Sequence, residues 1–271
     1  MRDDTLRLGV APDPSHADWT QQRIRTPDGV WLDGALLAGP AGTRSAIVLA
    51  NGFTRSWRHE PTQRIARRLC VHGSVQMFDF RGHHRSGGVS TVGKAEVTDL
   101  QSVVTHLRAH GYRTITTVGF SMGASVVLRH AAEHGGVTAV VAVSGPGQWY
   151  YRGTRPMRLL HRGVEHPLGR LALRTAYGVR VTNRRWDPAP ADPTQAAARL
   201  SSTPLLVVHG DSDDFFPVDH AERIHTAAGA HSELWIEPGF GHAERAISTE
   251  LVERIGTWVA GVTSPASAPP S

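Results

Sequence analysis

The chain of 271 residues contains a single cysteine, Cys70, and this excludes an intramolecular disulfide. Nothing around Cys70 indicates a reactive thiolate, and we interpret it as a structural thiol near the end of a helix. The sequence also lacks an apolar run of about 18 to 20 residues, the length that spans a bilayer. Its first residues have no apolar core of the kind that a secretory signal carries. We therefore expect a cytoplasmic protein without a membrane span.

Lysine is almost absent, because Lys94 is the single lysine among 29 basic side chains. The formal net charge is +5, but the charge is unevenly distributed. Residues 150–199 contain ten arginines and three carboxylates, a balance of +7, which leaves −2 for the rest of the chain. Any attraction for an anionic partner is therefore expected in this segment. The segment has no recognisable nucleic-acid-reading module, so we expect no nucleic-acid partner.

Short strand-like runs alternate with helix-like runs along most of the chain, which predicts an α/β protein with a mostly parallel sheet and helices on both faces. Two strand-like runs, 23–25 and 31–37, flank the turn signal Pro27-Asp28-Gly29 and predict an N-terminal antiparallel hairpin. The buried-strand runs that follow are 46–50, 75–80, 114–120, 137–143, 205–208 and 234–236. Apolar residues at helical spacing lie at Leu100, Val103, Val104 and Leu107, and again at Leu251, Ile255, Trp258 and Val262.

The alternation is interrupted once, by an arginine-rich and aromatic segment that we interpret as an inserted cap. The tail contains only Thr, Ser, Pro, Ala residues and cannot bury enough surface to fold, so we expect it to be disordered. The predicted organisation is an N-terminal extension at 1–22, a core at 23–146 and 202–262, the cap at 147–201 and the tail at 263–271.

A serine motif lies where the strand run 114–120 meets a helix-like run. Gly119-Phe120-Ser121-Met122-Gly123 supplies G-x-S-x-G in a strand–turn–helix context, in which the serine is exposed on a sharp turn. We therefore predict Ser121 as a nucleophile. A serine hydroxyl needs a contacting base that is oriented by a carboxylate, and sixteen histidines offer too many candidates to choose from composition alone.

Four further motifs accompany the serine motif. They are Leu49-Ala50-Asn51-Gly52-Phe53, the run Asp79-Phe80-Arg81-Gly82-His83-His84-Arg85-Ser86, and the two later loops Gly210-Asp211-Ser212-Asp213-Asp214-Phe215-Phe216-Pro217 and Gly239-Phe240-Gly241-His242. In this order the motifs resemble those of the α/β-hydrolase family, over nearly all of 23–262. Asn51 stands where the family usually has histidine, and His84 where glycine is more usual.

The resemblance implies roles for particular residues. It selects Asp213 as the acid, with Asp211 as the nearest competitor, and His242 as the base. It implies an oxyanion hole formed by the backbone N–H groups of Phe53 and Met122. Asp79 and Arg81 are expected to brace a loop rather than to react. No cofactor and no metal is implied.

Within the family, the Gly-x-Ser-Met-Gly sequence and the short cap most resemble esterase, monoacylglycerol-lipase and serine-aminopeptidase-like members. The expected activity is hydrolysis of a carboxylic ester or thioester through an acyl-enzyme, and the expected partner is a small acyl substrate. Candidate substrate-binding residues in the cap are Trp149, Tyr150 and Arg155. We hypothesise an apolar acyl part beside a negative charge; the alternative is that the cap arginines are simply solvated surface.

Other interpretations remain open at this stage. The same three residues would serve an acyltransferase or a cyclising thioesterase, and a non-catalytic binding protein of this fold is a third alternative. Gly88-Val-Ser-Thr-Val-Gly93-Lys94-Ala95 nearly matches a phosphate-binding loop but lacks its hydroxyl and a preceding strand. The pairs His106/His110 and His130/His134 supply two ligands each, too few for zinc, and we expect solvated helix faces. The sequence does not indicate an oligomeric state.

Overall fold

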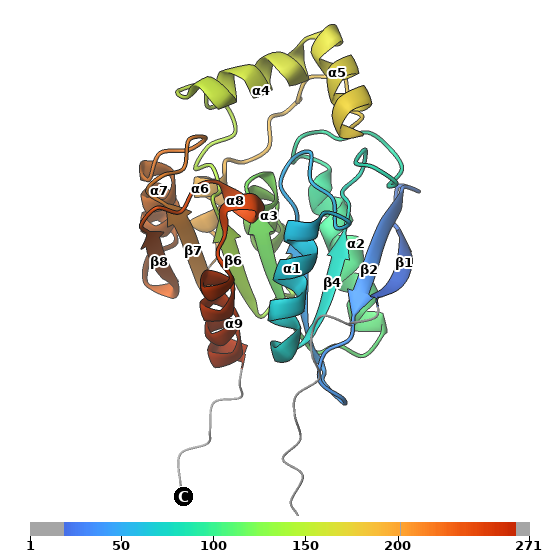
Figure 1. Cartoon of the computed structure of the whole chain (residues 1–271), viewed down its shortest axis with the longest axis vertical. Helices are drawn as coiled ribbons and strands as arrows, with labels where there is room; N and C mark the ends of the chain where they lie inside the picture. The colour runs from blue at the N-terminus through green and yellow to red at the C-terminus, as the bar shows by residue number, and fades with distance from the viewer. Residues whose placement is uncertain (1–18, 201, 264–271) are drawn as a thin grey trace, which may run out of the picture.

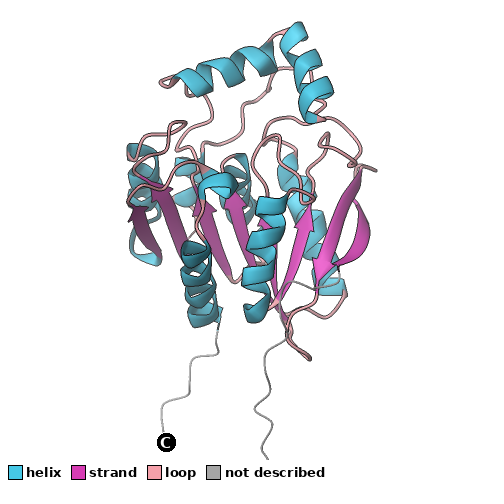
Figure 2. Ribbon diagram, in the orientation of Figure 1, coloured by secondary structure: helices cyan, strands magenta, loops and turns pink. Residues whose placement is uncertain are grey.

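The computed structural model describes residues 19–200 and 202–263. Within these residues the chain forms one eight-stranded sheet in the order β1-β2-β4-β3-β5-β6-β7-β8 (Figures 1 and 2). The strands are β1 (Trp19–Arg25), β2 (Trp31–Leu37), β3 (Ser45–Ala50), β4 (Ser74–Phe78), β5 (Thr114–Phe120), β6 (Ala139–Val143), β7 (Leu205–Gly210) and β8 (Ser232–Glu237). All neighbours from β4 to β8 pair in parallel, whereas β2 pairs antiparallel with β1 and β4.

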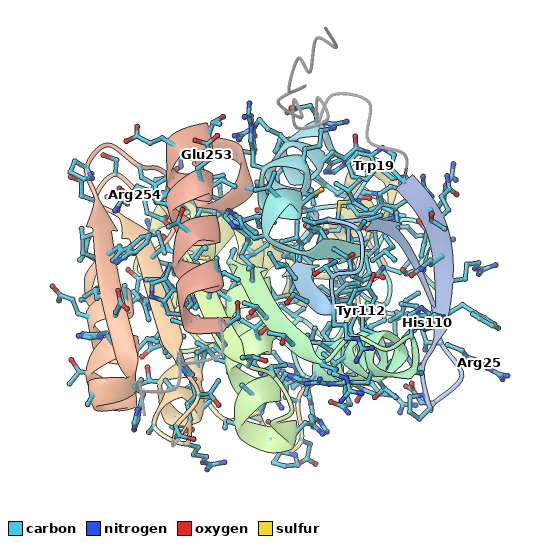
Figure 3. All side chains as sticks on the ribbon, turned by 90° about the horizontal axis from the view of Figure 1, so that it is seen from below. Trp19, Arg25, His110, Tyr112, Glu253 and Arg254 are labelled. Carbon is cyan, nitrogen blue, oxygen red and sulfur yellow. The ribbon has the colours of Figure 1, made fainter. Side chains whose placement is uncertain are left out.

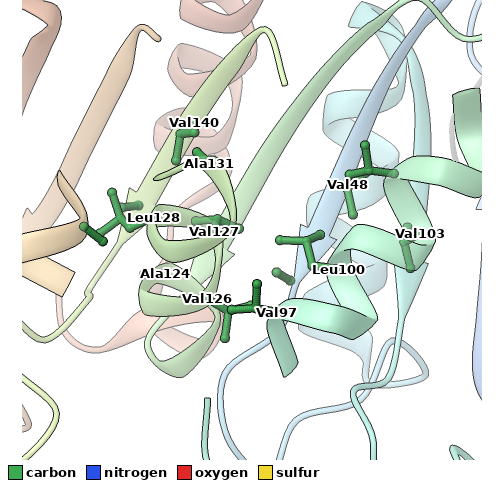
Figure 4. Close-up of a cluster of buried hydrophobic side chains, with 14 of the residues drawn as sticks. Val48, Val97, Leu100, Val103, Ala124, Val126, Val127, Leu128, Ala131 and Val140 are labelled. Carbon is green, nitrogen blue, oxygen red and sulfur yellow. The ribbon is translucent and has the colours of Figure 1, made fainter. Parts of the chain in front are cut away.

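Helices cover both faces of the sheet, as parallel strands that are buried on both sides require. They are α1 (Glu60–Leu69), α2 (Glu96–Ala109), α3 (Met122–His134), α4 (Arg155–Glu165), α5 (Pro167–Tyr177), α6 (Pro193–Ala197), α7 (Asp219–Ala228), α8 (Ala243–Ala246) and α9 (Thr249–Thr263). On one face, residues of α2, α3, α6 and α7 form a buried cluster with the sheet, part of which is drawn in Figure 4. On the other face α1, α8 and α9 form a second cluster.

Apolar periodicity explains why α2 and α3 lie where they do. Leu100 and Val103 lie one turn apart on α2 and are buried in this cluster (Figure 4). Ala124, Val127 and Ala131 recur in the same way on α3. The two helices that the sequence pattern marked by their spacing, α2 and α9, therefore pack on opposite faces of the sheet.

Charged side chains border both edges of the sheet, which is a common protection against pairing with another chain. On the β1 side, the guanidinium of Arg25 lies 5.7 Å from the ring centre of Trp31. On the β8 side, Arg254 of α9 pairs with Glu237 at 2.7 Å. Figure 3 shows these two sides from below, with Trp19 and Arg25 on β1 and Arg254 on α9.

The predicted α/β architecture and the N-terminal hairpin are confirmed, with differences at the element ends. β1 begins at Trp19, so residues 19–22 belong to the hairpin rather than to an N-terminal extension, because they pair with 34–37 of β2. Thr263 ends α9 and is not part of a tail. The rest of the predicted extension and tail, 1–18 and 264–271, lies outside the described residues.

Residues 147–193 leave the sheet after β6 and return to it before β7. In Figure 1 their helices α4 and α5 lie beyond the carboxyl ends of the strands. The two ends of the segment are joined, because Thr194 donates to the Gly147 carbonyl from its backbone N–H at 3.2 Å and from its hydroxyl at 2.6 Å. The Gly147 N–H in turn donates to Nδ1 of His220 in α7 at 2.9 Å. The two ends of the segment are thus held together at one place on the core.

Candidate active site

Ser121 lies on the sharp turn between β5 and α3, with φ 52° and ψ −114°. Few non-glycine residues adopt a positive φ, and such strain persists only where the surroundings enforce it. Here the turn is tightly packed: a Cβ on Gly123 would lie 2.0 Å from the Ala50 carbonyl oxygen, and one on Gly119 would lie 2.3 Å from the Gly123 oxygen. Only glycine at both positions lets β3, β5 and α3 approach closely enough to hold Ser121 in this conformation.

The structure brings Ser121, His242 and Asp213 together from three separate loops. His242 follows β8, and its Nε2 lies 3.0 Å from Oγ of Ser121. Asp213 follows β7, and its Oδ2 lies 2.8 Å from Nδ1 of His242. The Phe215 ring stacks on the imidazole, with ring centres 4.2 Å apart, and restricts its rotation. These contacts form an unbroken hydrogen-bonded series from carboxylate to hydroxyl.

Asp213 is distinguished from Asp211 by its surroundings. The Asp213 side chain is fully buried, and its Oδ1 accepts the backbone N–H groups of Phe215 at 2.8 Å and Phe216 at 3.1 Å. Nε2 of the buried His209 lies 3.7 Å from Oδ2 and donates to the Phe216 carbonyl at 2.8 Å. Asp211 is exposed and instead accepts the Gly239 N–H at 2.7 Å. The geometry therefore places Asp213, and not Asp211, against His242.

The backbone N–H groups of Phe53 and Met122 have no acceptor among the described residues, and both residues line the same cavity as Ser121. Asn51 holds the loop before Phe53. Its Nδ2 donates to the Phe78 carbonyl at 3.1 Å, and its Oδ1 accepts the Thr62 hydroxyl at 3.2 Å. Asparagine thus anchors this loop from a position where the family pattern has histidine.

Glu244 is a buried residue of the site that the sequence analysis did not identify. Its Oε1 accepts the Gly52 N–H at 2.6 Å, which joins the loop carrying His242 to the loop carrying Phe53. Burial raises the pKa of this carboxyl, against the opposing effect of the Gly52 hydrogen bond. The preceding residue, Ala243, has φ 53°, and its N–H donates to the Ser144 hydroxyl at 3.1 Å. No local pattern marks Glu244, since its partner lies 192 positions away.

Asp79 and Arg81 are placed as loop braces, in agreement with the sequence prediction. Asp79 accepts the Trp57 N–H and the Ser56 hydroxyl, each at 2.8 Å, and burial raises its pKa to about 7. Arg81 Nε donates to the buried Asp99 at 2.9 Å. Neither Asp79 nor Arg81 lines the cavity at Ser121.

A cavity of about 560 Å³ lies over Ser121, within the range of small-molecule sites. Its walls come from the core and from the segment 147–193. Among its apolar lining residues are Val92, Pro146, Trp149, Met157, Leu160, Val164, Val181, Trp186 and Phe216. Of the three cap residues predicted to bind substrate, Trp149 and Tyr150 line the cavity. Arg155 is exposed at the start of α4 and does not, whereas Arg170, Arg184 and Arg185 do.

The candidate metal residues lie in two pairs, with ring centres 4.2 Å apart in His106/His110 and 5.5 Å apart in His130/His134. Residues 19–200 and 202–263 contain no group of three or more His, Cys, Asp or Glu side chains placed to hold a metal ion. The solvated face predicted for His130 is wrong. That ring is buried, its Nε2 contacts Oε1 of Gln101 at 2.8 Å, and burial lowers its pKa to about 3.

Among the same residues, no helix is both long and apolar enough to cross a membrane. Cys70 is half-buried just after α1, and burial raises the pKa of its thiol. This position suits a structural thiol, because thiolate formation is disfavoured there.

The fold and the arrangement at Ser121 are those of a hydrolase of the α/β class. Residues 47–254 match the profile of the alpha/beta hydrolase family, and the chain belongs to this family. A monoacylglycerol lipase of Mycolicibacterium smegmatis is 28% identical over 244 residues, covering 73% of this chain and 81% of the lipase.

Solved structures of other proteins share the fold. An esterase of Pyrococcus furiosus superposes with a TM-score of 0.73 at 23% identity, covering 94% of this chain and 97% of the esterase. The alpha/beta hydrolase GrgF from Penicillium superposes with a TM-score of 0.70 at 19% identity, covering 91% of this chain and 99% of GrgF.

Proposed function

We propose that this protein is a serine hydrolase that cleaves a carboxylic ester or thioester through an acyl-enzyme intermediate. The observation that carries the proposal is the pair of contacts at His242, 3.0 Å to the Ser121 hydroxyl and 2.8 Å to the Asp213 carboxylate. A base in contact with a serine, itself oriented by a buried carboxylate, is the arrangement that activates a hydroxyl as a nucleophile. The similarity to a monoacylglycerol lipase supports ester chemistry.

In the proposed reaction, Nε2 of His242 takes the proton of Ser121 as Oγ attacks the carbonyl carbon. The developing oxyanion accepts hydrogen bonds from the N–H groups of Phe53 and Met122, each contributing about 3 kcal/mol of transition-state stabilisation. His242 then gives the proton to the leaving group, and the acyl group stays on Ser121. A water molecule, deprotonated by the same imidazole, attacks the carbonyl carbon of the acyl-enzyme. The bond from this carbon to Ser121 Oγ then breaks, Oγ recovers the proton from His242, and the carboxylic acid leaves.

Asp213 orients the base in this scheme. Its carboxylate accepts a hydrogen bond from Nδ1–H of His242, which leaves Nε2 unprotonated and able to accept the serine proton. The same carboxylate stabilises the imidazolium that forms during the reaction. The two backbone N–H groups at Oδ1 fix the carboxylate, so that the imidazole is held in one orientation.

We further propose that residues 147–201 act as a cap over the site and bind the acyl part of the substrate. The apolar side chains of α4, including Met157, Leu160 and Val164, line the cavity opposite Ser121. An acyl chain in this cavity would bury apolar surface at about 25 cal/mol per Å². Trp149 and Tyr150 remain proposed binding residues.

The test is intact-mass measurement after treatment with a fluorophosphonate, with hydrolysis of p-nitrophenyl butyrate and octanoate followed in parallel. We expect one adduct and ester turnover, both abolished in Ser121→Ala and both retained in the exposed control Ser212→Ala. An adduct that persists in Ser121→Ala would overturn the proposal. Labelling without ester hydrolysis would contradict ester cleavage and favour a thioesterase or an acyltransferase. Product analysis in the presence of an added thiol or alcohol would distinguish these two activities.

A further inference from the structure

Two arginines of the cavity wall have no charged partner within the described part of the chain. Arg184 and Arg185 lie between α5 and α6 and line the cavity that contains Ser121. Neither guanidinium forms an ion pair with any residue in 19–200 or 202–263. Arginine side chains with no internal partner beside an apolar cavity are available to a ligand.

The short loop that carries these arginines is fixed on both sides. Two residues before Arg184, the Thr182 N–H donates to the Ser90 carbonyl at 2.9 Å. Directly after Arg185, the Trp186 indole N–H donates to the Thr91 carbonyl at 2.7 Å. The backbone of the arginine pair is therefore positioned before any ligand arrives, which reduces the entropy lost on binding.

Lys94 also holds this loop, at the two residues that follow Trp186. Its ammonium group donates to the carbonyls of Asp187 at 3.0 Å and Pro188 at 2.8 Å. The segment that resembles a phosphate-binding loop, 88–95, thus has a different role in this protein. It supplies the backbone and the lysine that hold the arginine-bearing loop against the core.

Glu96 in turn holds the supporting segment in place through hydrogen bonds to residues 90–93. It is fully buried, and its two carboxylate oxygens accept the hydroxyls of Ser90 at 2.7 Å and Thr91 at 2.6 Å. They also accept the N–H groups of Thr91 at 2.8 Å and Gly93 at 2.9 Å. Four hydrogen bonds to one buried carboxylate make a rigid support, and they connect the arginine pair to the core of the molecule.

The acidic side chain in the cavity wall does not cancel these charges. Among the described lining residues Glu165 is the single carboxylate, and it pairs with Arg152 at 2.6 Å and with His161 at 3.0 Å. The hydrogen bond from Arg152 holds the pKa of Glu165 below its ordinary value. A third lining arginine, Arg170, donates to the carbonyls of Val164 and Glu165. The cavity wall therefore carries a net positive charge.

We propose that Arg184 and Arg185 bind an anionic group, a carboxylate or a phosphate, on the ester substrate whose carbonyl is attacked by Ser121. This inference rests on the proposed ester hydrolysis and specifies its substrate class. Guanidinium groups form short, charge-assisted hydrogen bonds with both anions. The preferred substrate then differs from a monoacylglycerol, which carries no charge.

The test compares two esters that differ only in charge, mono-p-nitrophenyl adipate and its methyl ester. We expect kcat/KM at least about tenfold higher for the anionic ester, the size of one charge-assisted hydrogen bond. Arg184→Gln/Arg185→Gln should lower kcat/KM for the anionic ester to about that for the methyl ester, and so remove this preference. Added salt should weaken the preference as it screens the exposed arginines. The control Arg162→Gln/Arg174→Gln removes the same charge from exposed cap positions that do not line the cavity, and should keep the preference.

The outcomes separate this inference from the proposed function. Equal turnover of the two esters, or a preference that survives in Arg184→Gln/Arg185→Gln, would overturn the anion site and leave ester hydrolysis intact. If neither ester is hydrolysed, the labelling rates of two fluorophosphonates that end in a carboxylate or in its methyl ester decide the question. Equal rates would then overturn the anion site, whereas absence of labelling would overturn the serine mechanism itself.

Discussion

At the scale of single residues, the hydrogen bond between Glu244 and Gly52 has the clearest consequence for rate. It joins the loop that positions the base to the loop that carries the proposed oxyanion donor Phe53. Both loops must be correct at once, since a displacement of about 1 Å can lower a rate about a hundredfold. Glu244 is thus a positioning residue, which acts through groups that touch the substrate.

We predict that Glu244→Leu lowers kcat about 10- to 100-fold with little change in KM, because the buried Gly52 N–H loses its acceptor. Glu244→Gln is the matched control, since its amide oxygen accepts the same hydrogen bond, and we expect kcat within about threefold of the native value. Steady-state kinetics on p-nitrophenyl butyrate, with melting temperatures alongside, check this. Equal losses in both variants would contradict a positioning role for the hydrogen bond.

Asp213 and Asp211 offer a second pair of matched substitutions. We predict that Asp213→Asn lowers kcat by about 10⁴-fold, since an amide at this place favours the wrong imidazole tautomer. Asp211→Asn makes the same carboxylate-to-amide change at a residue that does not contact His242, and its kcat should stay within about threefold of the native value. Pre-steady-state measurement of p-nitrophenol release compares the two. The assignment of the acid fails if Asp211→Asn is the more damaging variant.

At the scale of secondary-structure elements, the contact between α2 and α3 contains a buried titratable group. His130 of α3 contacts Gln101 of α2, and burial lowers its pKa to about 3. In the unfolded chain the same imidazole titrates near its ordinary value of about 6.5. As the pH falls below that value, the unfolded state takes up a proton that the folded state does not. The stability contributed by the neutral ring is therefore lost progressively on acidification towards pH 3.

We predict that this group alone removes about 2 kcal/mol of the free energy of unfolding between pH 7 and pH 5. His130→Leu should flatten that part of the pH dependence, whereas the exposed His134→Gln should leave most of it. Urea unfolding at the two pH values gives the comparison. An unchanged pH dependence in His130→Leu would show that His130 is not the group responsible.

The elements show how far sequence alone reaches. The sequence predicts both ends of β5 and of the hairpin strand β2 correctly, because local apolar patterns and turn residues determine where these strands begin and end. The loops after β5, β7 and β8 were predicted to hold the site, and the structure brings their three residues into contact. Glu244 and the burial of His130 were not predictable, since each depends on a partner far along the chain. For the same reason the pattern singled out Arg155, while the fold turns Arg184 and Arg185 into the cavity wall.

At the scale of the whole molecule, the insertion after β6 begins and ends at one place. Gly147 and Thr194 are hydrogen-bonded to each other, so the two ends of the inserted segment lie side by side on the core. Burial lowers the pKa of His220 to about 4, so its ring stays a neutral acceptor for the Gly147 N–H at neutral pH. Adjacent ends of this kind are typical of segments that a domain can accept or lose.

We predict that replacing residues 148–193 with a short Gly/Ser linker leaves a folded α/β core. Far-ultraviolet circular dichroism should retain the signal of the sheet and its helices, and the fluorophosphonate should still label Ser121. The melting temperature should fall, since Trp149 no longer packs against the core. Discrimination between butyrate and octanoate esters should be lost with the cavity wall. An unfolded product would show that the segment is part of the folding unit.

The two tryptophans of the cavity wall make the intrinsic fluorescence of the protein sensitive to what the cavity contains. The rings of Trp149 and Trp186 lie 5.7 Å apart at an angle of 67°, and both line the cavity. Of the seven tryptophans in the chain, these two meet any molecule that enters. Occupancy will change the polarity around the indoles and therefore the wavelength and intensity of their emission. Ligands that are never turned over become visible by fluorescence without an attached dye.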